Sequence, residues 1–511
     1  MTPLQARHNS NGHWLSGNGA YAEFTKSQYS SDPRLRIQDP KCLKQKTMWP
    51  NMPVRIRVLS LGQNQNFIVK GELSDANALK VCLCSQNQFP NQQTVYLVEA
   101  FDPHTVEVLG SHFQLHPSFF VEHERIKDFD YDAFGQTDTV LLPSSLATRD
   151  HVTLKYSEPV YVSQGTSGLR LHCYATGRHI KRTRSGENML PVGVLRRKCS
   201  VWNREVDGAS DTIVLCDPKV TLLGTNGDKR PLLVDIYPFQ GGYVNFIPEK
   251  EQLKAQGGPP RSSILDDLTF YLTNHFSLLT DHSYSKGIQV FINKIIAGHY
   301  WELANFTNAT LAETQRRLSK HSDLAGFSVR DVERDWSDTQ ADERRSEQYC
   351  RELESVMLQL NIAPRAPTNA RIMDWSDYTE DFQFLHTGFK KLRRRAVSLN
   401  TAMTTLAGIA GNRQAVIQQK QSLREAKRTK ALTFLGLVFI PLAYVCSLFS
   451  MQGAFAPGGP LFWVYFLVAI PLVGLVSLGN WILDQGYSYD ASDWYAHNLL
   501  DRFKNKNKPP V

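Results

Sequence analysis

Two uninterrupted apolar runs near the end of this 511-residue sequence dominate its pattern of hydrophobic and polar positions. Residues 431–449 and residues 461–483 contain no Asp, Glu, Lys or Arg. At about 1.5 Å per residue, each would form a helix of roughly 28 Å or more, enough to cross a hydrocarbon core of about 30 Å. Backbone groups in lipid must bond to one another, so both runs are predicted to be transmembrane helices. A buried core helix is the alternative for either run taken alone.

Charge next to these runs predicts how they cross the membrane. Residues 385–430 hold eleven basic residues and one acidic residue, Glu425, whereas the linking residues 450–460 hold no charge. The end of the tail at residues 484–511 is also basic, through Arg502, Lys504, Lys506 and Lys508. The positive-inside rule therefore predicts a multi-pass protein with both termini in the cytosol and an extracytosolic loop at 450–460. The polar start of the sequence lacks signal-peptide and mitochondrial-presequence patterns, so the plasma membrane is the expected location.

The region before the apolar runs predicts a cytosolic α/β domain over residues 46–255. Short β-branched and aromatic runs bounded by turn residues predict strands; they lie at residues 54–61, 79–84, 94–101, 152–162, 169–175, 192–202 and 212–223. Helical turns are expected around residues 104–109 and 117–126. Residues 1–45 are rich in Ser, Asn, Gly and Gln and are predicted to be mostly disordered.

Helical spacing replaces this pattern after the boundary at Gly257-Gly258-Pro259-Pro260. Residues 256–376 are predicted to be a cytosolic helical region, and residues 377–449 a stalk helix that continues into the first membrane span. Apolar residues of the stalk follow alternating steps of four and three; they are Leu385, Phe389, Leu392, Ala396, Leu399, Met403, Leu406, Ala410, Arg413 (the polar exception) and Ile417. This heptad seam predicts packing against copies of the same helix. The alternative is an ordinary core helix within one subunit.

The overall prediction is thus an α+β membrane protein, in which the α/β domain and helical stalk lead into two C-terminal transmembrane helices. The net charge of +8 gathers beside the membrane, where lysine and arginine meet anionic headgroups. A lipid bilayer is therefore an expected partner and nucleic acid is not. We find no phosphate loop, nucleophile elbow or pair of metal ligands at helical spacing, so neither enzymatic activity nor a bound cofactor is expected.

Three smaller groups of polar residues also allow predictions. The acidic residues Asp331, Asp335, Asp338, Asp342 and Glu343 are either an ion sensor or a solvated helix face. His112, His116 and His123 are expected to be structural or surface residues, because their spacing is irregular. Cys82 and Cys84 are expected to share one face of a strand as reduced thiols.

The first span contains a proline within its apolar run: residues 432–452 include Pro441-Leu442 and Phe449, followed by Ser450-Met451-Gln452. This pattern resembles the CorA-type metal-ion transporters, which have Gly-Met-Asn where this chain has Ser450-Met451-Gln452. Residues 462–472 and 109–123 resemble fungal members of the family. The resemblance implies a homopentamer in which five first spans line one pore. Its implied function is passive flow of a divalent metal ion, with Mg²⁺ or a related ion as transported or regulatory ion.

The resemblance also assigns residues to the pore. Ser450, Met451 and Gln452 would form the pore mouth, which holds a hydrated metal ion through outer-shell contacts. The pore-lining positions would be Thr429, Leu432, Ile440 and Ala443; the alternative is that these residues only pack within the membrane.

Departures from the family pattern leave a second hypothesis open. Ser450 adds a side chain, Gln452 adds a methylene and rotamer freedom, and the loop lacks acidic residues that would concentrate cations. The protein would then be either a CorA-like divalent-cation channel or a non-conducting membrane-anchored scaffold or regulator.

Overall fold

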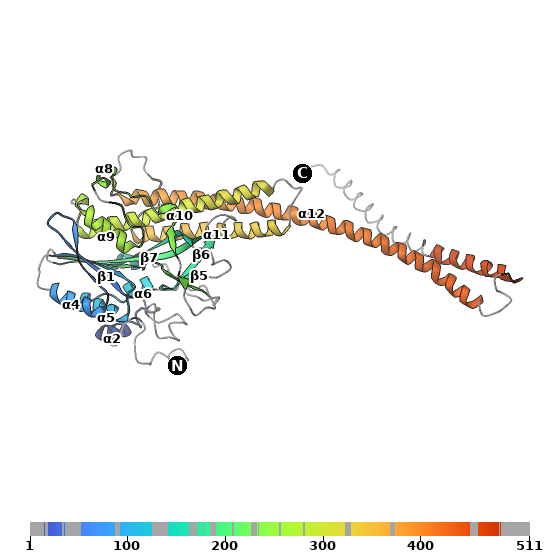
Figure 1. The fold of residues 1–511 in the computed structure, drawn as a ribbon, viewed down its shortest axis with the longest axis horizontal. Helices are drawn as coiled ribbons and strands as arrows, with labels where there is room; N and C mark the ends of the chain where they lie inside the picture. Colours follow the sequence, from blue (N-terminus) through green and yellow to red (C-terminus); the bar gives the residue numbers. More distant parts are fainter. Residues whose placement is uncertain are drawn as a thin grey trace, which may run out of the picture. The chain divides into compact units, whose positions relative to one another are not determined.

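The chain forms two compact units, residues Met1–Thr405 and residues Leu406–Val511 (Figure 1). The computed structural model describes the following residues, to which all structural statements below refer: 15, 19–32, 35, 53–86, 92–124, 142–162, 171–176, 178–183, 191–206, 209–225, 232–233, 235–254, 257–279, 282–321, 329–367, 374–449, 458–479 and 481.

A mixed β-sheet organises the first unit. Its described strands are β1 Arg55–Leu61, β2 Phe67–Leu73, β3 Gln93–Glu99, β4 His151–Val162, β5 Leu171–Cys173, β6 His179–Thr183, β7 Val192–Val206, β8 Ala209–Cys216, β9 Leu222–Thr225, β10 Leu232–Leu233 and β11 Ile236–Pro238. The main order is β10-β9-β5-β6-β7-β8-β3-β1-β2, while β4 pairs with β7 and β11. Among the described pairings, β3 with β8 is parallel and the others are antiparallel. Strand β7 is the centre, since it pairs with β4, β6 and β8.

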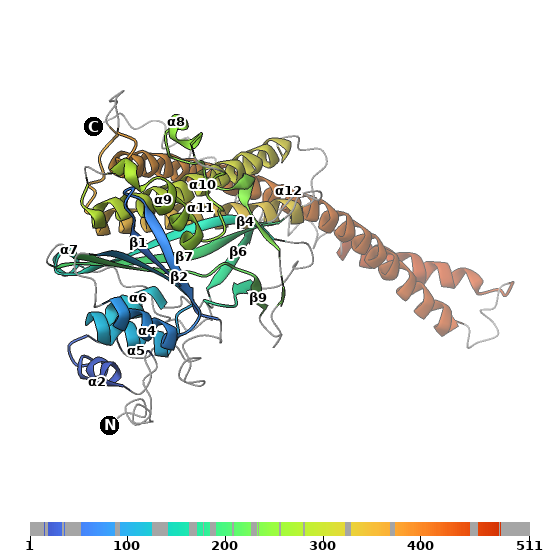
Figure 2. The ribbon, with the colours of Figure 1, turned by 60° about the vertical axis from the view of Figure 1, so that its left-hand side comes forward.

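Helices cover both faces of this sheet, which gives three layers (Figures 1 and 2). One face carries α2 Ala20–Ser27, α4 Ala76–Gln86, α5 Pro103–Phe113 and α6 Ser118–Glu124. The other carries α9 Ile264–Asn274, α10 Tyr284–His321, α11 Val329–Gln359 and the first part of α12 Tyr378–Phe449. Two short helices, α7 Pro143–Ala147 and α8 Glu249–Gln252, lie in connections. Each face of the sheet has its own apolar core, so central strands such as β3 and β8 are buried from both sides.

Most predicted strands and helices are confirmed, but residues 79–84 form part of helix α4 and not a strand. The alternation of Leu79, Val81 and Leu83 predicted a strand, yet only Leu79 and Leu83 are buried, one helical turn apart, and Val81 is 70% exposed. Asp75 accepts a bond from the Ala78 amide (2.8 Å) and caps the helix. Cys82 and Cys84 therefore do not share a face as predicted. The run at 212–223 is likewise divided between β8 and β9.

The prediction of disorder over residues 1–45 is wrong for the described residues around α2. Tyr21 is 4% exposed, and its hydroxyl donates to the Leu115 carbonyl (3.0 Å). The Glu107 carboxylate accepts from the Tyr21 and Ala22 amides (3.0 and 3.2 Å), which caps the start of α2. The helix is thus held by distant residues in α5 and just after it, and such contacts leave no local sequence signal.

Helix α12 runs unbroken for 72 residues, as predicted, and continues through Pro441. The first half of its seam is covered within the chain: Leu385, Phe389, Ala396, Leu399 and Met403 are all buried. There the prediction of packing against copies of the helix is wrong, because the alternative, an ordinary core helix, describes these residues.

The second half of the seam is more exposed than the first half. Leu406 and Ala410 are half-buried, Arg413 is exposed and Ile417 is 48% exposed. The apolar residues Ile409 and Val416 are exposed as well. The part of α12 that follows the first unit therefore has an apolar surface that the described chain does not cover.

The buried first half of the seam predicts a sharp contrast between two substitutions in α12. Phe389 is fully buried in the core, so Phe389→Ala should lower the unfolding free energy by about 3–5 kcal/mol. Val397 is 41% exposed, so Val397→Ala should change it by about 0.5 kcal/mol or less. Denaturant unfolding of both variants checks this; equal losses would contradict the described packing of α12.

Candidate functional site: one face of helix α12

The residues predicted to form a pore divide into two groups. Ser450, Met451 and Gln452 lie outside the described residues. The other four lie on α12 and are all exposed: Thr429, Leu432, Ile440 and Ala443. Leu432 and Ile440 are 76% and 72% exposed, which is unusual for large apolar side chains.

These four residues occupy one side of the helix. At about 3.6 residues per turn they fall within an arc of roughly 80°. Val445, roughly 180° from the middle of that arc, is 2% exposed. The neighbouring Cys446 thiol lies 3.0 Å from the Tyr465 hydroxyl of the second apolar helix, Phe462–Gly479. Cys446 lies on the flank of α12, roughly 80° from the middle of the arc and 100° from Val445. The second helix therefore contacts α12 outside the predicted pore-lining arc, whose four residues stay exposed.

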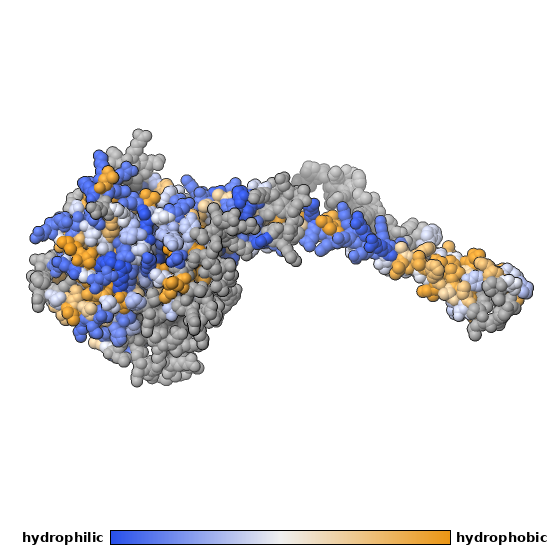
Figure 3. Space-filling model, viewed as in Figure 1, coloured by the Kyte–Doolittle hydropathy of each residue, from blue (hydrophilic) through white to orange (hydrophobic). Residues whose placement is uncertain are grey.

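Both helices are long and apolar enough to cross a membrane. Figure 3 shows apolar residues gathered over the end of α12 and over the second helix, next to a strongly hydrophilic stretch of α12. A core helix of a soluble domain would be buried, whereas among described residues of residues 431–479 only Val445 and Ala469 are buried. The core-helix alternative for the two apolar runs thus lacks the burial it requires within this chain.

The predicted pore-lining side continues along α12 as an almost uncharged strip. We define the polar strip as the exposed residues that follow steps of three and four up to Thr429; they are Gly411, Gln414, Gln418, Ser422, Glu425 and Thr429. Glu425 is its only charged residue and the only acidic residue of residues 385–430. The Gln and Ser side chains of the polar strip offer amide and hydroxyl oxygens, which can accept hydrogen bonds from the water ligands of a hydrated cation.

Most basic residues of the same segment lie on the other side of the helix. They are Arg413, Lys420, Arg424, Lys427, Arg428 and Lys430. Their mean direction is roughly 150° away from that of the predicted pore-lining residues, by about 3.6 residues per turn. These basic residues are close to the polar strip in the sequence, but most of them point to a different side of the helix.

The acidic residues considered as an ion sensor are mostly engaged in contacts within the first unit. Asp335 and Asp338 lie 2.8 and 3.7 Å from Arg317 of α10. Asp342 pairs with Arg345 (3.0 Å), and Glu343 accepts a hydrogen bond from Asn400 of α12. The side chain of Asp331 lies outside the described residues. These contacts hold α10, α11 and α12 together, so the described acidic residues do not converge on one ion site.

The first unit also contains a cavity of about 410 Å³, which is lined by residues of β4, β7 and α11 among others. Most of the charged side chains that line it are basic. Seven basic residues (Lys155, Arg178, Arg196, Arg197, Lys198, Arg344 and Arg351) face two acidic ones, Glu347 and Glu352. Carboxylates pair with several of these cations: Glu158 with Arg197 (3.0 Å), Glu347 with Arg351 (2.6 Å) and Asp217 with Arg178. The excess of positive charge disfavours a cation in this cavity. The run Arg196-Arg197-Lys198 was visible in the sequence, but its burial was not.

The three histidines have structural environments, as expected. His116 contacts Ser118 through Nδ1 (2.7 Å), and the ring of His112 packs edge-on against Phe113. His123 is buried beside Asp217, with Nε2 at 3.4 Å from Oδ1, and Nδ1 lies 3.0 Å from the Ser200 hydroxyl. Burial lowers the pKa of His123, although Asp217 acts in the opposite direction.

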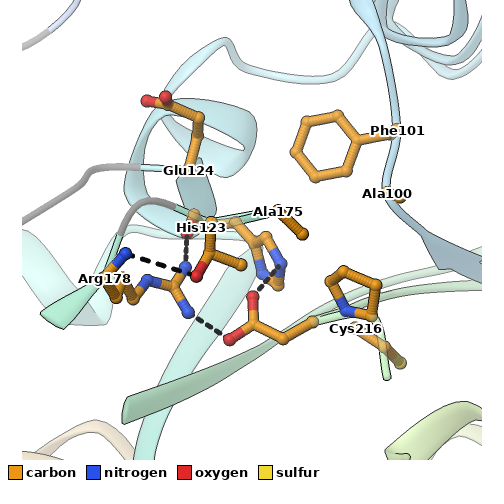
Figure 4. A pocket seen from close by; sticks show the side chains of 10 residues that line it. Ala100, Phe101, His123, Glu124, Ala175, Arg178 and Cys216 are labelled. Atoms are coloured by element: carbon orange, nitrogen blue, oxygen red, sulfur yellow. Dashed lines mark hydrogen bonds and ion pairs between the residues drawn. The ribbon is translucent and has the colours of Figure 1, made fainter. Parts of the chain in front are cut away.

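Asp217 is the centre of a polar group that includes His123 and Arg178, which are labelled in Figure 4. It pairs with Arg178 and accepts the Lys198 backbone amide (2.7 Å), while Arg178 also donates to the His123 carbonyl (2.7 Å). Burial alone would raise the pKa of Asp217, but Arg178 and His123 hold it far below its usual range. The adjoining cavity holds only about 30 Å³, so it has room for little more than a water molecule. We read this centre as a structural tie between α6, β7 and the end of β8.

Comparisons with known proteins add little to this description. No protein-family profile and no curated protein matches the sequence. Among solved structures, the full-length CmaX protein is similar over 85% of this chain and 98% of that chain, with 12% sequence identity and a TM-score of 0.30. A likeness at this level does not assign a family.

The Asp217 centre predicts a pH-dependent loss of stability. Asp217→Asn would leave Arg178 buried without its counter-charge and should lower the unfolding free energy by about 3–5 kcal/mol near neutral pH. Because the folded-state pKa is lowered, this contribution is present above the unfolded pKa of about 4 and is lost as pH falls toward the folded pKa. The difference in unfolding free energy between wild type and Asp217→Asn should therefore decrease by about 1 kcal/mol when the pH is lowered to about 3.

The matched control is Asp211→Asn, which removes the more exposed pair with Arg204 (3.0 Å). That pair should contribute about 0–1 kcal/mol. Denaturant unfolding of both variants at the two pH values measures the effect. If Asp217→Asn were no more costly than Asp211→Asn, the structural role of the centre would be wrong.

Proposed function

We propose that this protein is a CorA-like channel that conducts divalent cations, with Mg²⁺ the expected ion, through a homo-oligomeric pore lined by α12. The observation that carries the proposal is the open, nearly uncharged side of α12 that combines the polar strip with Leu432, Ile440 and Ala443. The second apolar helix contacts a different side, so copies of α12 can meet along this one. The resemblance of residues 432–452 to the CorA-type family supports the same arrangement.

The chemistry of the strip fits a hydrated divalent ion. Mg²⁺ holds its water ligands tightly, and side-chain amides and hydroxyls can contact those waters without the charge that would trap the ion. Leu432 and Ile440 would form an apolar constriction that closes the pore by dewetting. Passive flow then suffices, because moving a charge of two through 100 mV releases about 4.6 kcal/mol.

The positions of the basic residues remove an electrostatic objection to this pore. A dense ring of lysine and arginine on the conduction path would repel a divalent cation. In α12 the mean direction of these side chains is roughly 150° from that of the polar strip, with Arg428 at its flank, and Glu425 is the charged residue that lies on the strip. The same basic residues are suited to anionic lipid headgroups at a cytosolic membrane surface. In the proposed topology both termini are cytosolic, and the plasma membrane is the expected location.

A second candidate function is a non-conducting, membrane-anchored scaffold or regulator. It is favoured by Ser450 and Gln452, which replace the Gly and Asn of the family motif, and by the uncharged linking segment. Both candidates use the same two membrane helices and involve no catalytic step. They differ only in whether ions pass.

Influx into liposomes distinguishes the two candidates. Vesicles loaded with a magnesium-sensitive dye and held at an inside-negative potential should show Mg²⁺ influx through the full-length protein. Gln452→Ala removes the amide at the pore mouth and should reduce influx by roughly tenfold, whereas Gln452→Asn should retain or raise it. Absence of influx from all three proteins would favour the scaffold.

The pore side of α12 has its own test. Ile440→Ser places a hydroxyl in the proposed constriction and should raise influx several-fold by favouring wetting. Leu435→Ser is the matched control: Leu435 is also exposed and apolar, but it lies roughly 140° from Ile440 around the helix. Equal effects of the two substitutions would contradict a pore along the Ile440 side.

Self-association is a separate prediction from the exposed second half of the seam. Ile417→Asp introduces a charge on this apolar surface and should shift the protein from its oligomer, expected to be a pentamer, toward smaller species. Gln419→Asp adds the same charge on another side of the helix and should leave the oligomer unchanged. Light scattering in mild detergent measures both; a wild-type protein that is strictly monomeric would contradict the proposed assembly.

A further inference from the structure

Three side chains with metal-binding atoms meet between α11 and α12. Cys350 and Glu354 are one helical turn apart on α11, and His386 comes from α12. The Glu354 Oε1 atom lies 3.0 Å from His386 Nε2 and 3.8 Å from the Cys350 sulfur. All three ligand atoms lie within 4.8 Å of one another. Sequence analysis missed this Cys-x-x-x-Glu spacing, because its third member is more than thirty positions away in the sequence.

The spacing of these atoms matches a tetrahedral metal centre. Metal–sulfur, metal–nitrogen and metal–oxygen bonds of about 2.3, 2.0 and 2.1 Å place tetrahedral ligands roughly 3.3–3.6 Å apart. The two measured distances, 3.0 and 3.8 Å, lie on either side of this range. Small rotations of the side chains would therefore be enough to place all three atoms around one ion.

Burial and charge also fit a bound metal ion. Cys350 and His386 are 2% and 3% exposed, and Cys350 belongs to the apolar core beneath the two helices. The Glu354 side chain is 47% exposed, so water can reach the group from its side. A thiolate and a carboxylate together neutralise a divalent ion, which lowers the cost of placing charge at the edge of a core. The thiol proton passes to solvent when the metal binds.

The geometry points to a transition-metal site of the zinc type, with Cys350, Glu354 and His386 as protein ligands and water as the fourth. Thiolate and imidazole ligands favour Zn²⁺ or Co²⁺ over Mg²⁺, which prefers oxygen ligands in an octahedral arrangement. The site therefore binds a different class of ion from the proposed cargo, and it does not depend on the proposed pore. A bound ion would clamp α11 to the helix that continues into the membrane span.

Cobalt binding to the full-length protein tests the site directly. Reduced, metal-free protein in detergent should bind one Co²⁺ per chain, with a thiolate-to-cobalt charge-transfer band and the visible bands of tetrahedral Co²⁺. Zn²⁺ should displace the cobalt, and an excess of Mg²⁺ should not. Cys350→Ser should abolish the charge-transfer band, and His386→Gln should weaken binding at least about tenfold.

Control variants separate ligation from folding and from other thiols. Cys84→Ser removes an exposed thiol outside the group and should leave the cobalt spectrum unchanged. Glu354→Gln changes a half-exposed side chain, so it should weaken Co²⁺ binding about tenfold while thermal unfolding of the metal-free protein stays near that of wild type. The site is refuted if wild type shows no charge-transfer band at one equivalent of Co²⁺, or if Cys350→Ser keeps it. In that case the three residues form a hydrogen-bonded group only.

Discussion

The main physical constraint on this molecule is the need to cover one helix of 72 residues in two different surroundings. In its first part α12 completes the apolar core of the first unit, where Phe382 and Phe389 are fully buried. Beyond Thr405 the same helix has apolar and polar sides that the described chain leaves exposed, apart from the contact with the second apolar helix. Exposed apolar surface on this scale is stable only against lipid or protein. A membrane fits the apolar end of α12, and copies of α12 are the proposed cover of the part before it.

The first unit supplies a rigid base for that helix through buried polar ties as well as apolar packing. Asp217 binds groups from α6, β7 and the segment before β6, so elements distant in the sequence share one carboxylate. Its low pKa reflects the net effect of these partners, which outweighs the cost of burial. On the opposite layer, Lys294 of α10 reaches Asp381 of α12 (2.6 Å). The first tie joins α6 to the sheet, and the second joins α10 to α12.

Sequence patterns predicted the helices and strands in which buried positions repeat regularly. They failed where contacts between residues distant in the sequence determine the structure. The strands of the sheet, α10, α11 and the unbroken α12 were predictable from periodicity. Helix α4 was not, because a single alternating apolar run fits a strand until one knows that Val81 is exposed. The partner of the Leu385–Met403 seam was misassigned, since a heptad pattern shows that a surface is covered but not which helix covers it. The Cys350, Glu354 and His386 group depends on α11 meeting α12, which no local pattern encodes.

Most basic residues in the second part of α12 gather on one side of the helix, which the amino-acid composition does not show. A stretch with eleven basic residues and one acidic residue suggests a barrier to cations. Helical phase changes this interpretation, because a helix separates residues by direction even when they are adjacent in sequence. Lys427 and Thr429 are two positions apart, yet they point roughly 160° apart by about 3.6 residues per turn. One segment can thus present cations to anionic lipid and amides, hydroxyls and one carboxylate to a shared axis. Net charge therefore argues for membrane contact without arguing against cation passage.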